Sequence, residues 1–338
     1  MATTSLLIDT TTHIDLVRSL SDKLKACYVF PDTAEEICAR LQKHLDDGEY
    51  ADITEGEFLA LALTMHMQDV SHDEHLWVRW HPEPLPDDDR PLRQNPEWMA
   101  DRQQEARLDN YGLHKVERLP GNVGYLGIHY FHRPAWGGDT IVAAMNFLAN
   151  VNALIIDLRK CTGGYPGMIA LISTYLFGEE PVHLDSIYWR EEGVTQQYWT
   201  LPYVPGKRLG EQPVYVLISK ATFSAGEGFA YDLKTRQRAT LVGEKTDGGA
   251  HPGASYRLHS HFELFIPVGR AINPVSGGNW EGIGVTPDVL VPQEQAFKVA
   301  YNMALQSVIS GLGGSPSGPS KALIEEAQAA LKRRRQWC

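Results

Sequence analysis

Short β-branched apolar runs alternate with helical stretches from about Asn122 onward, and this alternation constrains the fold more than any other feature. Apolar runs of this length, bounded by turn residues, predict strands, and helices between them indicate an α/β core. The expected strands are Val123–Ile128, Leu154–Leu158, Val214–Ile218, Thr240–Val242 and Phe262–Pro267, and the expected helices lie near Thr140–Asn150, Gly167–Leu176 and Ser224–Thr235.

The N-terminal region has a helical pattern instead. Apolar residues between Ile14 and Leu24 recur at helix spacing, and Thr33-x-x-Glu36 and Thr54-x-x-Glu57 are typical of capping boxes that begin further helices. Residues 81–101 are rich in proline and acidic groups, which indicates a connector. The expected division is a helical domain over 1–80, a connector over 81–121, an α/β core over 122–310, and a flexible linker with a basic C-terminal helix over 311–338.

Composition and charge restrict the partners that the chain can bind. Its 338 residues, 43% of them hydrophobic, are enough for a main domain and a smaller one with an ordinary core. The net charge of −11 is spread without a basic stripe, so we do not expect a nucleic-acid partner. No apolar run approaches the roughly 18 residues of a membrane span, and residues 1–15 lack a signal-peptide pattern. We therefore expect a cytoplasmic protein with no membrane partner.

Cysteine and histidine spacing gives no sign of a metal centre. His129-x-x-His132 and His259-x-His261 have loose ligand spacing and, on strands, need no metal. Without Cys-x-x-Cys spacing or an export signal, we expect free thiols, no zinc site and no cofactor. The cysteines concerned are Cys27, Cys38, Cys161 and Cys338.

The segment Leu217–Glu227 is the strongest candidate for chemistry. It places Ser224 near a strand-to-helix junction, where a hydroxyl is held on a rigid turn and the free N–H groups of the helix's first turn, including that of Ala225, face developing negative charge. Serine is also a common helix N-cap, and this segment alone favours the cap.

Three further segments carry chemistry that could act with Ser224. Gly163 and Gly164 follow a buried strand, where their N–H groups can face an oxyanion, although paired glycines more often form a tight turn. His75 ends the helical region and has the chemistry of a general base, or is an ordinary interface histidine. Glu281 lies in a Gly- and Pro-rich loop and could orient an imidazole, or belong to a surface turn.

Taken in order, these segments resemble the tail-specific (C-terminal processing) proteases, the tricorn protease core and interphotoreceptor retinoid-binding protein, most closely the branch without a PDZ domain. The resemblance covers residues 12 to 295 and implies a crotonase-like β-β-α spiral core with an N-terminal helical bundle. The motifs that carry it are Tyr28–Pro31, Asp73–Leu76, Gly124–Gly127, Ile155–Arg159 with Gly163-Gly164, Phe223–Glu227, Val242–Thr246 with Gly249–Pro252, and Gly284–Asp288.

The family offers two catalytic designs, and the resemblance selects one. Tail-specific proteases use a lysine after the serine, but Gly249 occupies that position here, so the serine–lysine design is absent. The tricorn-like design places its histidine, serine and glutamate at His75, Ser224 and Glu281. Glu74 replaces the serine that precedes the tricorn histidine.

The resemblance thus implies a serine peptidase that forms an acyl-enzyme. Ser224 attacks the carbonyl, His75 takes and returns the proton, and Glu281 holds the imidazole. The N–H groups of Gly164 or Gly163 and of Ala225 form the oxyanion hole. Glu227, one helical turn beyond the serine, supports the site, and His251 is the alternative base.

Other functions remain open. A non-catalytic binder of apolar ligands would explain the incomplete agreement with either protease design, and a hydrolase of small esters or amides would explain why no PDZ segment is present. An α/β-hydrolase is disfavoured because Thr222 stands where its motif needs glycine. Cys161 replaces the usual asparagine of the glycine loop, and we do not expect it to be a nucleophile. The expected partner is a peptide or small acyl substrate, with a homo-oligomer left open.

Overall fold

The computed structural model describes residues 8–313 and 317–335, which form two compact units. The helical unit contains the residues up to Gln104 together with Ile187–Gln196 and His251–Ile272. The sheet unit contains Glu105–Ser186, Gln197–Ala250 and the residues from Asn273 onward. Each unit therefore combines segments that are far apart in the sequence, and the boundaries differ from the expected division at residues 80 and 121.

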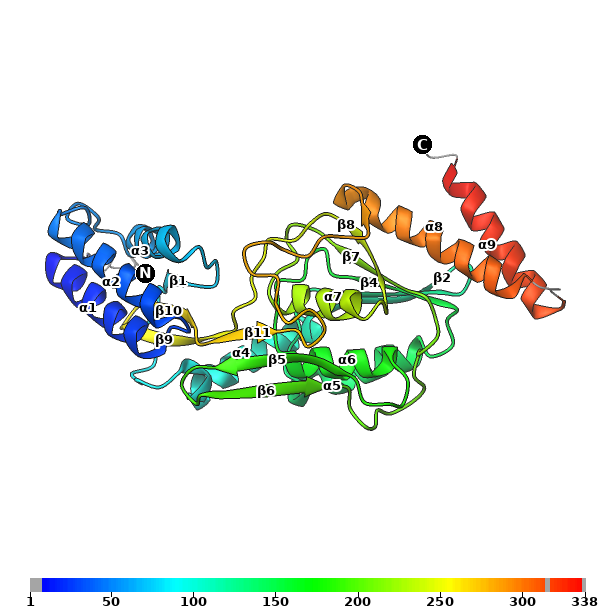
Figure 1. Ribbon diagram of the computed structural model, residues 1–338, viewed down its shortest axis with the longest axis horizontal. Coiled ribbons are helices and arrows are strands. Elements are labelled where there is room, and N and C mark those ends of the chain that lie inside the picture. The colour runs from blue at the N-terminus through cyan, green and yellow to red at the C-terminus, as the bar shows by residue number, and fades with distance from the viewer. Residues whose placement is uncertain (1–7, 314–316, 336–338) are drawn as a thin grey trace, which may run out of the picture. The chain divides into compact units, whose positions relative to one another are not determined.

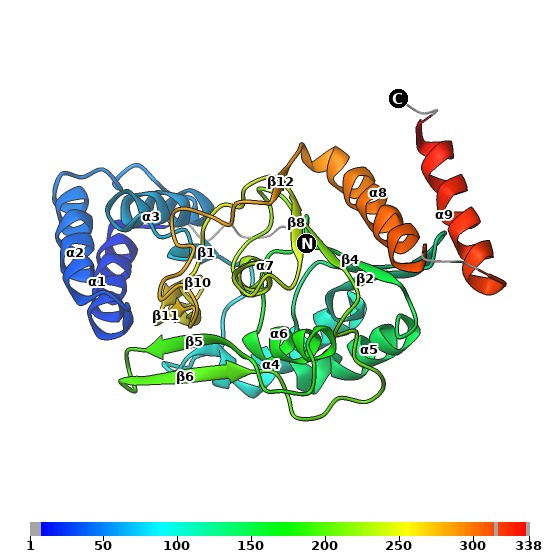
Figure 2. The ribbon, with the colours of Figure 1, turned by 45° about the vertical axis from the view of Figure 1, so that its right-hand side comes forward.

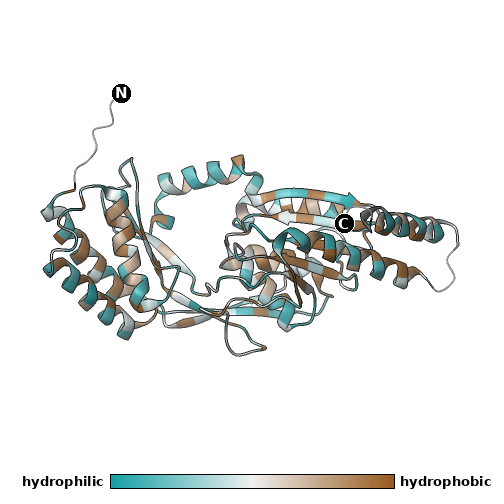
Figure 3. Cartoon of the chain, turned by 90° about the horizontal axis from the view of Figure 1, so that it is seen from above, coloured by the Kyte–Doolittle hydropathy of each residue, from teal (hydrophilic) through white to brown (hydrophobic). Residues whose placement is uncertain are grey.

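Three helices form the main part of the helical unit, as the sequence predicts (Figure 1). They are α1 (Thr10–Cys27), α2 (Pro31–Asp46) and α3 (Gly56–Ser71), followed by the 3₁₀ turn η1 (Leu92–Gln94) and α4 (Pro96–Leu108), which continues past Gln104. Their buried leucines and isoleucines share one core, which drives the packing. Figure 3 shows brown and teal residues interspersed along the helices, as amphipathic helices require.

The prediction of two capping boxes is wrong, although helices do begin near both positions. Helix α2 begins at Pro31 after Phe30, and α3 begins at Gly56 after Glu55, and neither has a side-chain cap. Thr33 already lies inside α2, because proline at the first helical position is itself a start signal.

A small antiparallel sheet completes the core of the helical unit. It has the order β1-β10-β9, formed by Trp77–Trp80, Phe262–Pro267 and Gly253–His259, with Val78 opposite Leu264. The strand predicted at Phe262–Pro267 therefore exists but belongs to the helical unit rather than to the α/β core. The reason is long-range pairing: the β9–β10 hairpin pairs with β1, which follows α3 directly.

The sheet unit contains a six-stranded sheet, parallel except for the pairing of its edge strand β2, and it confirms the predicted mixed α/β fold. Its order is β12 (Val289–Leu290), β8 (Thr240–Gly243), β7 (Val214–Ile218), β4 (Ala153–Asp157), β3 (Val123–Ile128) and β2 (Leu113–Leu119). Every residue of β4 and β7 is buried, as expected for parallel strands covered on both faces.

Helices cover both faces of this sheet (Figures 1 and 2). Helix α8 (Gln293–Leu312) lies on one face, where its alanines pack against Ile155 and Tyr215, and α9 (Pro319–Arg335) packs against α8. The other face carries α5 (Pro134–Phe147), α6 (Pro166–Leu176) and α7 (Ala225–Thr235).

The remaining elements were not predicted from the sequence. A third sheet has the order β11-β5-β6, formed by Gly269–Ile272, His183–Trp189 and Val194–Trp199, and β5 and β6 each contain residues of both units. The expected connector contains α4, the turn η2 (Asn110–Gly112) and β2. The predicted linker falls partly on residues 314–316, which are outside the described range.

Among the described helices, none has the length and apolar character needed to cross a membrane. Cys27, Cys38 and Cys161 carry free thiols, and Cys338 lies outside the described residues.

Candidate active site

Two loops meet at the carboxyl edge of the sheet, because β4 and β7 are parallel neighbours and end on the same side. The hydroxyl of Thr222 donates to the carbonyl of Leu158 at 2.8 Å, and that of Ser219 donates to the carbonyl of Arg159 at 2.7 Å. The amide of Phe223 donates to the carbonyl of Cys161 at 2.9 Å. The loop after β7 is therefore fixed to the loop after β4.

Ser224 ends the loop after β7 in a strained conformation. It occupies the N-cap position of α7, as one of the two sequence interpretations predicts, with φ of 53° and ψ of −121°. An ordinary N-cap residue has extended dihedrals, and a positive φ in a residue other than glycine costs on the order of 1–3 kcal/mol. Capping alone does not explain this conformation, whereas a nucleophile presented on a tight turn does.

Glu227 holds the strained turn in place. Its side chain is fully buried, and Oε2 accepts the amides of Ser224 and Gly249 at 2.9 Å each. Oε1 accepts the hydroxyl of Thr246 at 2.6 Å and the amide of Gly248 at 2.8 Å. Burial raises the pKa of this carboxyl group to about 7, although the four hydrogen bonds oppose the shift. The predicted supporting residue thus contacts the backbone of the candidate nucleophile.

The glycine pair lies directly beside Ser224. Gly163 and Gly164 have φ values of 126° and 134°, and a Cβ at Gly163 would come within 2.9 Å of the Cβ of Ser224. A Cβ at Gly164 would come within 2.2 Å of the carbonyl oxygen of Phe131. Among the described residues, the amides of Gly163, Gly164 and Ala225 have no hydrogen-bond acceptor. These amides are therefore available to a ligand near the serine.

Adding a methyl group at Gly163 should damage the site. In Gly163→Ala the new Cβ meets Ser224 and the backbone must keep a φ that alanine resists, so we expect peptide hydrolysis to fall about 100-fold, the size of a lost oxyanion donor. Steady-state kinetics would measure the loss. Gly193→Ala, at φ 62° with open space around it, controls for backbone strain alone, and equal losses in both variants would contradict the prediction.

The two predicted bases lie in the helical unit around one carboxylate that sequence reasoning did not single out. Nδ1 of His251 is 2.8 Å from Oδ2 of Asp73, and Oδ1 of Asp73 accepts the backbone amide of His75 at 3.0 Å. The hydroxyl of Tyr28 also donates to Asp73, at 3.2 Å. His72, in a left-handed conformation after α3, turns the chain so that Asp73 and His75 are buried.

The electrostatics of this group favour a neutral imidazole at His75. Burial lowers the pKa of His75 to about 4, and the neighbouring His251 lowers it further while Asp73 opposes the shift. A histidine must be neutral to accept a proton, so His75 is in the required state at neutral pH. Glu74, between the two buried residues, is exposed.

Glu281 fixes the chain immediately before His251. One of its carboxylate oxygens accepts the amide of Ala250, and Asn279 accepts the amide of Glu281 at 3.0 Å. The indole N–H of Trp280 donates to the carbonyl of Gly249 at 2.8 Å. The Glu281 loop therefore braces residues 248–250, the same loop whose Gly248 and Gly249 amides donate to Glu227.

The predicted residues thus fall into two groups. Ser224, the glycine pair, Glu227 and Glu281 belong to the sheet unit, and the two histidines belong to the helical unit. Within the sheet unit the structure brings the serine, the glycines and Glu227 together, as the sequence predicts.

Cys161 is part of the glycine loop but is chemically quiet. Its side chain is fully buried, and burial raises the pKa of the thiol to about 12. A thiol in this state is not a nucleophile at neutral pH, as expected from the sequence. Its Sγ lies 3.9 Å from the carbonyl oxygen of Gly163, where it fills space under the loop.

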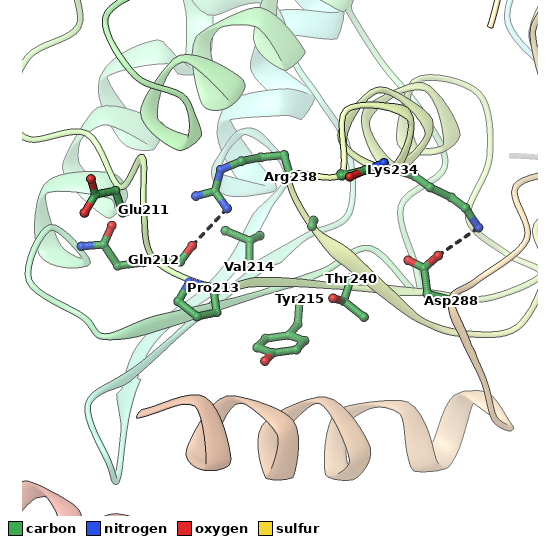
Figure 4. A pocket seen from close by; sticks show the side chains of 11 residues that line it. Glu211, Gln212, Pro213, Val214, Tyr215, Lys234, Arg238, Thr240 and Asp288 are labelled. Carbon is green, nitrogen blue, oxygen red and sulfur yellow. Dashed lines mark hydrogen bonds and ion pairs between the residues drawn. The ribbon is translucent and has the colours of Figure 1, made fainter. Parts of the chain in front are cut away.

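A cavity of about 440 Å³ lies elsewhere, at the amino ends of β7 and β8 (Figure 4). Three of its charged side chains have partners: Lys234 pairs with Asp288 at 3.2 Å, and Arg238 donates to the carbonyl of Gln212 at 3.0 Å. Ser224 follows the carboxyl end of β7, so this cavity is not the candidate active site.

One side-chain cluster of the helical unit has metal-ligand chemistry. His44, Glu49 and His66 bring potential ligand atoms within 4.8 Å of one another. The two imidazoles stack nearly parallel, with centroids 3.7 Å apart and 10° between their planes. Lone pairs in parallel planes do not converge on one ion, so this arrangement does not fit a metal centre.

Comparison with known proteins places the chain in a family. The model of peptidase family S41 matches residues 122–291, about half of the chain, and the N-terminal domain of peptidase S41 in eukaryotic IRBP matches residues 4–110. The chain belongs to peptidase family S41. The resemblance inferred from the motifs is therefore confirmed.

Several S41 relatives are C-terminal processing enzymes. The S41 chain is 29% identical over 181 residues to a carboxyl-terminal-processing protease of Picosynechococcus sp., covering 53% of this chain and 41% of the relative. It is 31% identical over 196 residues to the chloroplastic carboxyl-terminal-processing peptidase 2 of Arabidopsis thaliana, covering 53% and 36%. The chain thus spans less than half the length of these relatives.

Solved structures with the same fold extend over more of the S41 chain. A Parabacteroides merdae protein described as a candidate peptidase has a TM-score of 0.59 at 18% identity, covering 87% of this chain and 96% of that one. The tricorn protease has a TM-score of 0.55 at 14% identity, covering 94% and 37%. At these identities the likeness shows the fold alone.

Proposed function

We propose that this S41 chain is a serine peptidase that cleaves peptide bonds through an acyl-enzyme on Ser224. The observation that carries the proposal is the strained Ser224 turn, which Glu227 holds against Gly163 beside amides that have no acceptor among the described residues. A hydroxyl beside unused N–H donors suits acyl transfer, because the negative charge of a tetrahedral intermediate develops there.

The proposed reaction has two halves. The Ser224 hydroxyl attacks the peptide carbonyl while a histidine takes its proton, and the amides of Ala225 and of Gly164 or Gly163 bind the oxyanion. The same histidine returns the proton to the leaving amine, and a water molecule then hydrolyses the ester by the same steps.

For the base we propose His75, with His251 as the alternative. His75 is neutral at neutral pH, as a proton acceptor must be, which supports the first. Nδ1 of His251 lies 2.8 Å from the carboxylate of Asp73, which supports the second, because a carboxylate fixes the tautomer of a catalytic imidazole. Glu281 would orient the imidazole, directly or through the loop that it braces. We also propose that the core is a crotonase-like spiral and that the protein is cytoplasmic.

A fluorophosphonate probe tests the proposal directly. The probe reacts with an activated serine, so the wild-type protein should be labelled at Ser224 and Ser224→Ala should not. Matched peptide, ester and small amide substrates would then show which acyl class is turned over. A protein that is folded but neither labelled nor active on any of them would instead be a non-catalytic binder.

The two histidines can be separated by substitution. His75→Ala should lower kcat by about 1,000-fold or more if His75 is the base, whereas His251→Ala should act less strongly through lost contacts with Asp73. Steady-state kinetics on one peptide would compare the two variants. The reverse order of effects would assign the base to His251.

Acid stability offers an independent check on the buried state of His75. Its folded pKa, about 4, lies below the ordinary value of 6.5, so the folded protein binds fewer protons than the unfolded chain between these values. The stability that neutral His75 contributes is complete above about pH 6.5 and is lost as the pH falls towards 4. Urea midpoints should fall over this range more steeply in the wild type than in His75→Gln, and parallel curves would contradict it.

A further inference from the structure

Arg133 is a cation near the glycine pair, and no carboxylate of the described residues pairs with it. Its guanidinium carbon lies 4.6 Å from the ring centre of Tyr165 and 5.7 Å from that of Trp136. The side chain is half-buried, its Nε is buried, and this nitrogen has no hydrogen-bond partner among the described residues. Within the same residues, Arg133 forms no ion pair with any carboxylate. A buried guanidinium donor left unused costs free energy unless a ligand supplies the acceptor.

Two other partly buried arginines of the sheet unit have structural roles, because their guanidinium groups donate hydrogen bonds within the protein. Arg159 binds both oxygens of Asp157, at 2.9 and 2.6 Å. Arg238 donates to three backbone carbonyls, including those of Gln212 and Leu209 at 3.0 and 2.6 Å. Arg133 has aromatic contacts instead, which hold the guanidinium in place, while its Nε finds no acceptor in the described part of the chain.

The backbone fixes Arg133 close to the proposed oxyanion loop. The backbone of Phe131 forms two hydrogen bonds with the segment that contains the glycine pair. Its amide donates to the carbonyl of Gly163 at 2.8 Å, and its carbonyl accepts the amide of Tyr165 at 2.7 Å. Arg133 lies two residues further along, a separation of at most about 7 Å between Cα atoms. Its aromatic partner Tyr165 directly follows Gly164, so the guanidinium and the glycine pair are positioned by the same elements.

We propose that Arg133 is a specificity-determining residue that binds a carboxylate of the peptide substrate next to the scissile bond. The inference rests on the proposed peptidase function and names the chemistry of its substrate. A guanidinium binds a carboxylate through two parallel hydrogen bonds, and rings that fix the guanidinium reduce the entropy lost on binding. The carboxylate is supplied either by an aspartate or glutamate side chain or by the C-terminus of the peptide.

Matched peptides test the proposal and identify the source of the carboxylate. A proteome-derived peptide library digested with the wild-type protein would first supply a cleaved sequence. Peptides of that sequence would then carry glutamate or glutamine at each position flanking the cleaved bond, and a free or an amidated C-terminus. We expect one carboxylate to raise kcat/KM about 10- to 100-fold over its neutral partner, the size of a charged hydrogen-bonded contact.

The variants assign that preference to Arg133. Arg133→Gln should lose the preference, so that its kcat/KM is the same on the charged and the neutral peptide, and Arg133→Lys should keep part of the preference because the charge remains. The matched control is Arg102→Gln, which removes an arginine that also stacks on an aromatic ring, Trp98, and should keep the full preference.

The outcomes separate this inference from the proposed function. Cleavage with no preference for any carboxylate, or a preference that survives in Arg133→Gln, would refute the role of Arg133 and leave the peptidase proposal intact. A wild-type protein that cleaves no peptide and is not labelled by the fluorophosphonate probe would refute both.

Discussion

Replacing Ser224 by alanine should lower kcat for peptide hydrolysis by at least about 1,000-fold, because the residual rate would depend only on substrate binding and the oxyanion donors. The fold should survive. The Cβ stays in place, and losing a serine at a helix N-cap costs about 1 kcal/mol. Steady-state kinetics on a cleaved peptide, together with a thermal unfolding curve, would separate the catalytic effect from the small loss of stability.

Ser276→Ala is the matched control for this substitution, since Ser276 is an exposed serine of the same unit. It should change neither kcat nor the unfolding midpoint. Activity of Ser224→Ala within tenfold of the wild type would remove Ser224 from the reaction, and with it the acyl-enzyme that the strained turn led us to propose.

Replacing Glu227 by glutamine should destabilise the protein by about 2 kcal/mol and lower its activity, because the variant leaves a buried amide without an acceptor. The new side-chain NH₂ can donate to Thr246, and its oxygen can accept Ser224 and Gly249, but the amide of Gly248 then faces a donor. Urea unfolding and kcat measured on one preparation would show both effects. Glu294→Gln, a change to an exposed glutamate that is also in the first turn of a helix, should leave both unchanged.

The cost of Glu227→Gln should also depend on pH. Since the folded pKa of Glu227, about 7, exceeds its ordinary value of 4.5, the stability that protonated Glu227 contributes is complete below pH 4.5 and is lost as the pH rises through 7. The stability gap between wild type and variant should therefore be widest near pH 4.5 and narrow towards pH 8. A gap that widens with pH would show that the folded protein prefers the charged carboxylate.

The sequence predicts those strands whose own residues form an apolar segment between turn residues. Val123–Ile128 and Val214–Ile218 are short, largely apolar segments bounded by turn residues, and they form β3 and β7 with the predicted limits. The sequence also predicted correctly that Ser224, the glycine pair and Glu227 lie close together in space. The reason is that the parallel strands before these loops end at one edge of the sheet. Considered alone, the serine at position 224 would have been predicted only as a helix N-cap.

The missed features depend on contacts between distant segments. Strand β6 is largely exposed and polar, so it has no apolar pattern to reveal it. Nothing in Phe262–Pro267 shows that it pairs with Trp77–Trp80 rather than with the main sheet. Asp73 and Arg133 were overlooked for a related reason: their roles depend on the hydrogen-bond partners they have or lack, and partners are known only from the structure.

The composition of the helical unit has a consequence for how the chain is made. The core beneath α1, α2 and α3 includes residues of β9 and β10, which the ribosome produces only after most of the sheet unit has been synthesised. During synthesis the apolar faces of these helices stay uncovered until Phe262 and Leu264 have been made. Contacts formed this late slow folding, and the uncovered apolar surface is one that chaperones recognise. For the same reason, no single cut of the chain yields two fragments that each contain one complete unit.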